Sequence, residues 1–277
     1  MDAGVLRNVA IVIRWQKGPM MKPQIDFVFV GQTIPERRRK DPSVVQVCSA
    51  GYSPTLRQLV RIYPLPVSFG GHRWENYMIP IERNPKDSRK ESFKISSEKR
   101  KISLDLVTDD IVFLQKEDRS KCITDLAKMA TPSIAELNTC RRSLGIIKPK
   151  NLEGYWASNP EHAPLFERSD LFEKTEKEIT KKGREHWARL RFSDDSGFHD
   201  LMLNSWDVYE WHRRHSEKHP LSDVWLKLQI GNPEYEHLLL IGNMAAIRNR
   251  WLVIAVIAYK KPIQVDEKQF DLFGGIT

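Results

Sequence analysis

Several features that mark common protein classes are scarce or missing in this sequence of 277 residues. No apolar run reaches the ~18 residues that a membrane-spanning helix needs. The longest candidate, residues 251–258, has the length of a strand. An apolar patch at residues 9–13 is followed by Arg14 and Lys17 without a small-residue cleavage site, which argues against secretion. The sequence therefore predicts a cytoplasmic protein with no membrane partner.

Cysteine is also scarce. Cys48, Cys122 and Cys140 are far apart and odd in number, so they form neither a disulfide framework nor a zinc knuckle. Unpaired cysteine is among the most buried residue types in proteins. We therefore expect three small core residues, rather than nucleophiles, in a reducing compartment.

Motifs of known catalytic sites are missing. There is no serine elbow, P-loop, GxGxxG or CxxC pair, so hydrolases, NTPases, dehydrogenases and zinc ribbons all lack their signature. The nearest grouping to a metal-dependent nuclease site is Asp109, Asp110, Lys116 and Glu117, which follow no recognised spacing. These absences favour a binding protein over an enzyme, and they predict no cofactor.

Four histidines in the second half are the weak candidates for a metal site, although no metal is predicted. The last three lie at helical spacings of three and four, and imidazoles on one helix face can bind zinc. However, there is no HExxH motif to supply the carboxylate. Solvated side chains beside basic neighbours are the expected alternative for this set, which comprises His199, His212, His215 and His219.

Charge is the first positive signal. Lysine and arginine total 44 against 36 acidic residues, a formal net charge of +8. Such a balance favours polyanionic partners through long-range attraction and counterion release, although a moderately basic protein without such a partner remains the alternative. The most basic stretch is residues 83–101, which includes Arg89 and Lys90.

Residues 44–66 form the pattern around which the first half is organised. Two runs of alternating apolar residues flank a Gly-Tyr-Ser-Pro turn, which is typical of a β-hairpin. Side chains alternate across a strand. The second run therefore places apolar residues on one face and Arg57, Arg61 and Tyr63 on the other.

Residues 187–192 form the clearest alternating run in the second half. Trp187, Arg189 and Arg191 share one face of this strand, and its apolar residues share the other. Both halves are thus expected to present a basic and partly aromatic strand face to solvent.

The order of predicted elements indicates the fold class. In the second half, three strands, a helical segment and two strands follow the order of a small Greek-key barrel of the OB type. The first half offers similar strands without a visible helix. We expect a mainly β protein with some helix (α+β), in which two OB-like Greek-key barrels are joined by a helix. The expected divisions are an N-terminal extension (1–23), a first barrel (24–130), a connecting helix (131–145) and a second barrel with a helical insert (146–277).

The connecting helix has a clear start signal. Thr131 can cap it, and Ser133 with Glu136 offers an alternative capping box. Gly145 can end it.

OB barrels bind oligonucleotides across their second and third strands. Arginine contacts phosphates and stacks on rings, and an aromatic ring holds a base with ~1–3 kcal/mol. Ordinary surface arginines and a packed tryptophan are the alternatives. The predicted nucleic-acid-binding residues are Arg57, Arg61, Tyr63, Arg89, Lys90, Trp187, Arg189 and Arg191.

Short segments throughout the chain carry a resemblance. They are residues 45–51, 60–66, Trp74, 87–92, 143–149, His199, 206–207, Gly242 and Trp251. Together they resemble a set of largely uncharacterised prokaryotic proteins described as carrying a dual OB-containing domain. The resemblance spans residues 24–262. It implies two OB barrels and a role in nucleic-acid transactions, in defence against or carriage of mobile elements.

No catalytic residue is carried over from that resemblance. Members of the set often place cysteines before the position of His199, where this chain has Ser193 and Ser196. The resemblance therefore does not extend to a zinc site.

The leading hypothesis is a non-catalytic protein that binds DNA or RNA, as a subunit of a mobile-element or antiviral defence complex in which a protein partner supplies the chemistry. The alternatives are a protein–protein interaction scaffold and a metal-dependent nuclease.

Overall fold

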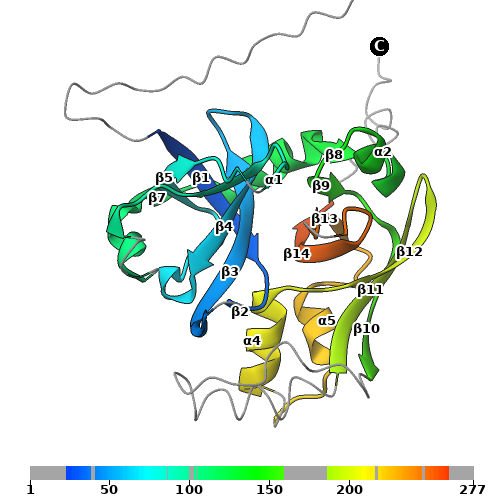
Figure 1. Cartoon of the computed structure of the whole chain (residues 1–277). Coiled ribbons are helices and arrows are strands. Elements are labelled where there is room, and N and C mark those ends of the chain that lie inside the picture. Colours follow the sequence, from blue (N-terminus) through cyan, green and yellow to red (C-terminus); the bar gives the residue numbers. More distant parts are fainter. Residues whose placement is uncertain are drawn as a thin grey trace, which may run out of the picture.

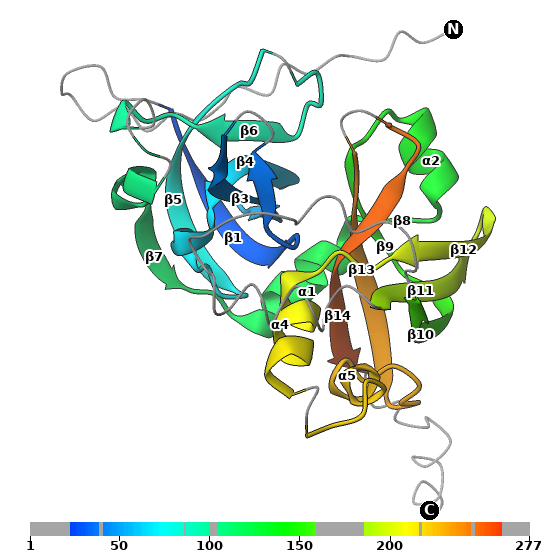
Figure 2. The same ribbon diagram turned by 60° about the horizontal axis from the view of Figure 1, so that its bottom comes forward.

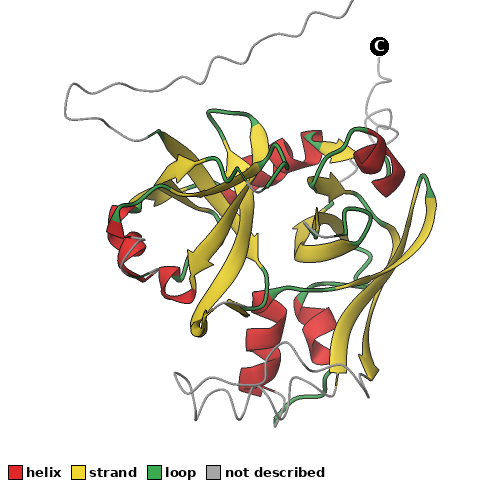
Figure 3. Cartoon of the chain, in the orientation of Figure 1, coloured by secondary structure: helices red, strands yellow, loops and turns green. Residues whose placement is uncertain are grey.

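The computed structural model describes residues 23–38, 41–85, 87–99, 103, 105–158, 186–215, 218–244 and 247–261. Two groups of strands lie side by side, with short helices around them (Figure 1, Figure 3). The chain is mainly β with few helices, as the sequence predicts. The expected N-terminal extension lies outside the described residues, apart from Pro23.

The first group forms a closed ring of five strands: β1 (Gln24–Gln32), β3 (Asp41–Ser53), β4 (Gln58–Pro66), β6 (Ser92–Ile95) and β5 (Glu75–Glu82). Each strand pairs with the next in that order, β4 and β6 run parallel, and β5 pairs back to β1. This first barrel also has short additional elements, namely β2 (Glu36–Arg38), η1 (Val67–Phe69), η3 (Asp105–Asp110) and β7 (Val112–Lys116).

Strand β1 contributes apolar side chains to both sides of the ring. Phe27 and Phe29 point into the barrel, where they join Val60 and Ile62 of β4 in one core. Val28 and Val30, which alternate with these rings, point outward but are buried as well. A short strand that is apolar on both faces must be covered on both, so something packs against the outside of this barrel.

The second group follows the expected order of strands, helices and two strands, except that the first of the three expected strands is divided into β9 and β10. Its strands are β9 (Leu144–Ile147), β10 (Lys150–Ser158), β11 (His186–Asp194), β12 (Gly197–Met202), β13 (Tyr235–Asn243) and β14 (Trp251–Lys260), with α4 (Trp206–His215) and α5 (Asp223–Lys227) between β12 and β13. One sheet holds β10, β11 and β12, and another holds β14, β13, β9 and the short β8 (Ala130–Thr131). A bridge between Leu203 and Val253 connects the two sheets.

We call the second group of strands the second barrel, and it shares a hydrophobic seam with the first. Val28 and Val30 of β1 pack with Leu240 of β13 and Ile254 of β14 in one cluster. Helix α1 (Arg119–Lys128) lies between the barrels (Figure 2) and adds its buried side chains to the same cluster. The seam therefore covers the outer face of β1, β3 and β4 that would otherwise face solvent.

The connection before the second barrel is shorter than expected. Helix α2 spans Ile134–Thr139, and the Ser133 hydroxyl accepts a hydrogen bond from the Glu136 backbone N–H, which confirms that part of the predicted cap. However, the helix does not continue to Gly145, because that glycine already lies in β9. Its missing side chain leaves room for Leu137, which would lie 2.3 Å from an added Cβ atom.

Candidate nucleic-acid interface

Arg61 lies at the centre of a polar network in the seam. It points out of the first barrel, as strand alternation predicts, but its exposure is only 2%. Its Nη1 donates to the Ser143 hydroxyl at 3.0 Å, and its Nη2 donates to the Ser143 carbonyl at 2.7 Å. The expectation that Arg61 faces solvent is wrong, because the second barrel covers this face.

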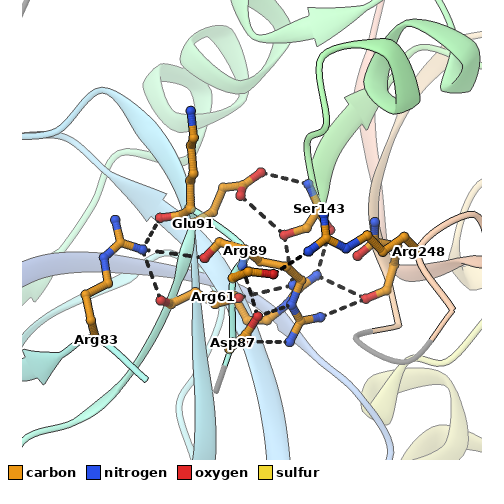
Figure 4. A network of polar contacts seen from close by, with 11 residues as sticks. Arg61, Arg83, Asp87, Arg89, Glu91, Ser143 and Arg248 are labelled. Carbon is orange, nitrogen blue, oxygen red and sulfur yellow. Dashed lines mark hydrogen bonds and ion pairs between the residues drawn. The ribbon is translucent and has the colours of Figure 1, made fainter. Parts of the chain in front are cut away.

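Glu91 supplies the opposite charge in the same network (Figure 4). Its buried carboxylate accepts hydrogen bonds from the Ser143 backbone N–H at 2.8 Å and from the Ser143 hydroxyl at 3.3 Å. Arg61 and Glu91 thus meet at one serine of the second barrel. Burial lowers the pKa of the Arg61 guanidinium, and the negative charge of Glu91 opposes this effect.

Three segments meet around this buried pair, and we call the place where they meet the loop junction. It comprises the described residues of three ranges: 83–92, the β5–β6 loop with the first residue of β6; 141–143, before β9; and 243–250, the last residue of β13 with the β13–β14 loop. Arg89 donates to the Asn243 carbonyl at 3.1 Å, and Arg248 donates to the Ser88 hydroxyl. Loops of both barrels are therefore held against each other.

The loop junction has an excess of positive charge at its surface. Its acids are already engaged, because Glu91 is buried in the network and Asp87 is paired with Arg89 at 2.6 Å. Partial burial alone would raise the pKa of Asp87, but the hydrogen bonds from Arg89 outweigh it and lower this pKa. Six cationic residues of the described junction are exposed: Arg83, Lys90, Arg141, Arg142, Arg248 and Arg250.

The structure separates the residues predicted in the first half. Lys90 is exposed at the loop junction, whereas Arg89 is partly buried and bound to Asp87. Arg57 is exposed but lies in the turn before β4, with a φ of 49°, so it is not on the strand as expected. Tyr63 is on β4, partly buried, and its hydroxyl accepts from the Gln46 amide at 2.6 Å.

The outer face of β10, β11 and β12 forms a second surface of interest. Arg189 and Arg191 point outward from β11 as predicted, with side-chain exposures of 29% and 43%. Arg189 donates to Asp200 at 2.8 Å, and Arg191 lies over the ring of Tyr155 at 4.2 Å. Since Arg191 also lies 3.6 Å from Asp200, both cations share one carboxylate.

This shared carboxylate weakens the positive charge of the β11 face. Partial burial would raise the pKa of Asp200, but hydrogen bonds from Tyr155 and Arg189 outweigh that effect and lower it. Trp187 is partly buried, and its ring lies 6.3 Å from that of Tyr209 on α4. The face is therefore less cationic than the loop junction, and its tryptophan packs against a helix.

The histidines are distributed over separate environments. Within the described residues, no group of three or more His, Cys, Asp or Glu side chains lies close enough to hold a metal ion. His199 pairs with Asp194 at 2.9 Å, and the ring of His215 stacks on Trp211. His219 lies 3.3 Å from Asp223.

His212 differs from the solvated histidine that the sequence predicts. It is buried, and its ring lies 4.9 Å from the ring of Trp156. Helix α4 turns this side chain toward the second barrel, away from the exposed His219.

The acidic residues considered for a nuclease have local partners. Asp109 pairs with Lys99 at 3.2 Å, and Asp110 accepts a hydrogen bond from the Ser97 hydroxyl. Glu117 accepts from the Asn76 amide at 2.7 Å. These contacts hold the carboxylates in the surface structure around β7.

The three cysteines differ in environment. Cys122 is buried in the seam, as expected, and burial raises the pKa of its thiol to about 11. Cys48 is partly buried, and burial also raises its pKa, although Arg61 and Arg89 oppose the rise. Cys140 is exposed after α2, so the expectation of a core residue is wrong for this position.

Thiol labelling should reproduce this order. At mildly alkaline pH we expect rapid reaction of Cys140 alone with a disulfide reagent, because the thiolate is the reactive form and the other two thiols are shielded and hold their protons. All three cysteines should react after unfolding in denaturant. Cys140→Ser serves as the control and should remove the rapid phase. Equal rates at Cys122 and Cys140 in the folded protein would contradict the structure.

Sequence reasoning missed Arg141, Arg142, Arg248 and Arg250. The sequence does show two short basic clusters, because Arg141 is next to Arg142 and Arg248 is two residues before Arg250. Nothing in the sequence, however, places these two segments beside residues 83–92.

No helix in the described parts of the chain is long and apolar enough to cross a membrane. A family model described as a domain of unknown function (DUF8758) matches residues 24–124, which cover the first barrel and the start of α1. No curated protein matches the chain.

Two solved structures are similar to the chain over most of its length. One is the tetrameric p202 HIN2, with 8% identity and a TM-score of 0.30, covering 87% of this chain and 93% of that one. The other is a murine DNA-binding protein bound to double-stranded DNA, with 6% identity and a TM-score of 0.30, covering 87% of this chain and 97% of that one. At these scores the likenesses carry no conclusion for this chain.

Proposed function

We propose that this protein binds nucleic acid through the phosphates of the polymer, at the loop junction. The observation that carries the proposal is the set of six exposed cations which three segments bring together there. Neutralising phosphates with Lys and Arg releases counterions, and this release drives binding without reading the sequence. Arginine adds charge-assisted hydrogen bonds to phosphate oxygens.

The buried network beneath these cations supports the same proposal. The Arg61–Ser143–Glu91 contacts join the two barrels, and Arg89 and Arg248 tie their loops together. Because contacts inside the protein hold the loops together, the backbone positions that carry the surface cations are set before binding. A preorganised set of cations loses less entropy on binding than a mobile set.

We further propose that both barrels are of the OB type. In the first barrel β1 pairs with β3 and β5, and β4 runs parallel to β6. In the second barrel the same pattern is present if the consecutive strands β9 and β10 count as one first strand, because β10 pairs with β11, β9 pairs with β13, and the Leu203–Val253 bridge is parallel. OB barrels use the loop between their fourth and fifth strands for oligonucleotides. Those loops are β5–β6 and β13–β14 here, and both lie in the loop junction.

The surface formed by the second and third strands is buried in one barrel and exposed in the other. The face of β3 and β4 is covered by the seam, whereas the face of β11 and β12 is open and carries Arg189 and Arg191. We propose the β11–β12 face as a second, weaker contact with the polymer.

Binding to labelled single-stranded and duplex oligonucleotides, followed by fluorescence anisotropy over a range of salt, tests the proposal. The triple variant Arg141→Ala, Arg142→Ala and Arg250→Ala should bind duplex DNA with a shallower slope of log K against log salt. The slope should fall by about 0.9 for each phosphate that the variant no longer neutralises. These three side chains are exposed, so their removal should leave the fold intact.

The matched control removes the same charge elsewhere. Lys128, Lys227 and Lys260 are exposed at other places, and their replacement with alanine should change the salt dependence much less. If both triple variants weaken binding equally, the loop junction is not the site. If the unmodified protein binds no oligonucleotide at low salt, the proposed function is wrong.

We also propose a cellular role, which the resemblance to dual OB proteins supports. The chain would act in the cytoplasm as a non-catalytic subunit of a defence or mobile-element complex, with a protein partner that supplies the chemistry. The proposed divisions are residues 24–130 for the first barrel, 131–145 for the connection and 146–277 for the second barrel. Copurification from the native host, with identification of bound proteins and nucleic acid, tests this role, and recovery of the chain alone would count against it.

A further inference from the structure

The loop junction contains no aromatic residue. Its three ranges include arginine, lysine and small polar residues, but no Phe, Tyr, Trp or His. Its two large exposed apolar side chains are aliphatic, namely Met244 at 39% exposure and Ile247 at 51%. Proteins that bind single strands combine a basic surface with aromatic side chains on which successive bases stack. The junction has the first of these features without the second.

The aromatic residues that directly follow the junction ranges in the sequence are buried. Phe93 is 8% exposed, and the guanidinium of Arg83 lies over its ring at 4.2 Å. Trp251 is 4% exposed, and its indole N–H donates to the Asn138 side chain at 2.9 Å. Neither ring is open to an unpaired base.

The strand faces on which OB barrels hold single strands are also occupied by protein contacts. The face of β3 and β4 is covered by the seam. On the open face of β11, the ring of Tyr155 lies beneath the Arg191 guanidinium, and the ring of Trp187 packs against Tyr209. An unpaired base would have to displace these contacts before it could stack on either ring.

Two exposed phenylalanines lie outside the junction. Phe113 is on β7, at the outer side of the first barrel and away from the second (Figure 2). Phe198 is 68% exposed on β12, beside the turn that joins β11 to β12. One ring can stack on one unpaired base, so a variant without the Phe198 ring separates stacking from phosphate binding.

We propose that the loop junction binds duplex nucleic acid in preference to single strands, through the phosphates of both backbones; this rests on the proposed function. Duplex DNA carries one negative charge per about 1.7 Å of its axis, about twice the density of one strand. Each neutralised phosphate contributes about 0.9 to the salt slope on a duplex, against about 0.7 on a single strand. A cationic surface without rings therefore gains more from the duplex.

Fluorescence anisotropy with the full chain tests this preference. One labelled DNA oligonucleotide without self-complementary segments is used alone and annealed to its complement, so that length and base sequence are matched. If all six exposed cations of the junction contact phosphates, the two salt slopes should differ by about 1.2. The duplex should bind more tightly, and its advantage should grow about 15-fold for each tenfold fall in salt.

Two variants locate the preference. The triple variant Arg141→Ala, Arg142→Ala and Arg250→Ala removes half of the exposed junction cations, so the difference between the two slopes should fall to about 0.6. Phe198→Ala removes an exposed ring outside the junction and should keep the full preference for the duplex. A loss of that preference in Phe198→Ala, or its full retention in the triple variant, would overturn the proposal.

The unmodified protein distinguishes the two levels of the proposal. Equal or tighter binding of the single strand at low salt would overturn the duplex preference and leave nucleic-acid binding in place. Absence of binding to both forms would show that the proposed function itself is wrong.

Discussion

Replacing Arg61 with methionine is expected to lower the free energy of unfolding by about 3–5 kcal/mol, the cost of removing one partner of a buried charge pair. Methionine resembles the aliphatic part of the side chain, so little packing is lost. The Ser143 and Asn243 carbonyls lose donors, and the carboxylate of Glu91 stays buried without its counter-charge. Urea denaturation followed by circular dichroism measures the change.

A double variant separates the charge effect from the packing effect. In Glu91→Gln the side-chain oxygen still accepts from the Ser143 N–H, but the negative charge is gone. Arg61→Met combined with Glu91→Gln should therefore be more stable than Arg61→Met alone, because no unpaired charge remains buried. If the losses in unfolding free energy from the two single variants add up in the double variant, Arg61 and Glu91 do not interact. The proposed role of the network in joining the barrels would then be wrong.

The contrast between Arg61 and Arg189 shows what the sequence can predict. Both follow the same pattern, a basic residue between apolar ones on a strand, and the pattern correctly places each on the outside of its barrel. The exposure then differs, because the second barrel covers β4 while β11 remains open. Alternation along a strand is local physics, but the identity of what packs against a face depends on contacts between distant segments.

The loop junction could not be predicted from the sequence, because it also depends on contacts between distant segments. Residues 83–101 are recognisable as a basic stretch, and Lys90 within it is exposed as a binding residue must be. Arg142 and Arg248 follow Lys90 by 52 and 158 residues along the chain. Only the pairing of β9 with β13, and the contact of Arg248 with Ser88, bring these segments together. The order of strands and helices in the second half is more local, and it was predictable.

Gly51 is the second position at which a small change should have a large effect. A Cβ atom added there would lie 2.2 Å from the Val28 carbonyl oxygen and 2.8 Å from the ring of Phe27. The Val28 carbonyl belongs to β1, which pairs on both sides with β3 and β5 and therefore cannot move away. We expect Gly51→Ala to lower the free energy of unfolding by about 3 kcal/mol, at the upper end of the cost of overpacking.

Gly145→Ala is the matched comparison for Gly51→Ala. Both glycines are buried in strands, and both substitutions reduce the entropy of the unfolded chain equally. The added atom at Gly145 meets the Leu137 side chain on α2, which can change rotamer, whereas at Gly51 it meets backbone. Gly145→Ala should therefore cost only about 1 kcal/mol. If Gly145→Ala is instead the more destabilising variant in urea denaturation, β1 must move more easily than the Leu137 side chain. That result would contradict a β1 that is held on both sides by β3 and β5.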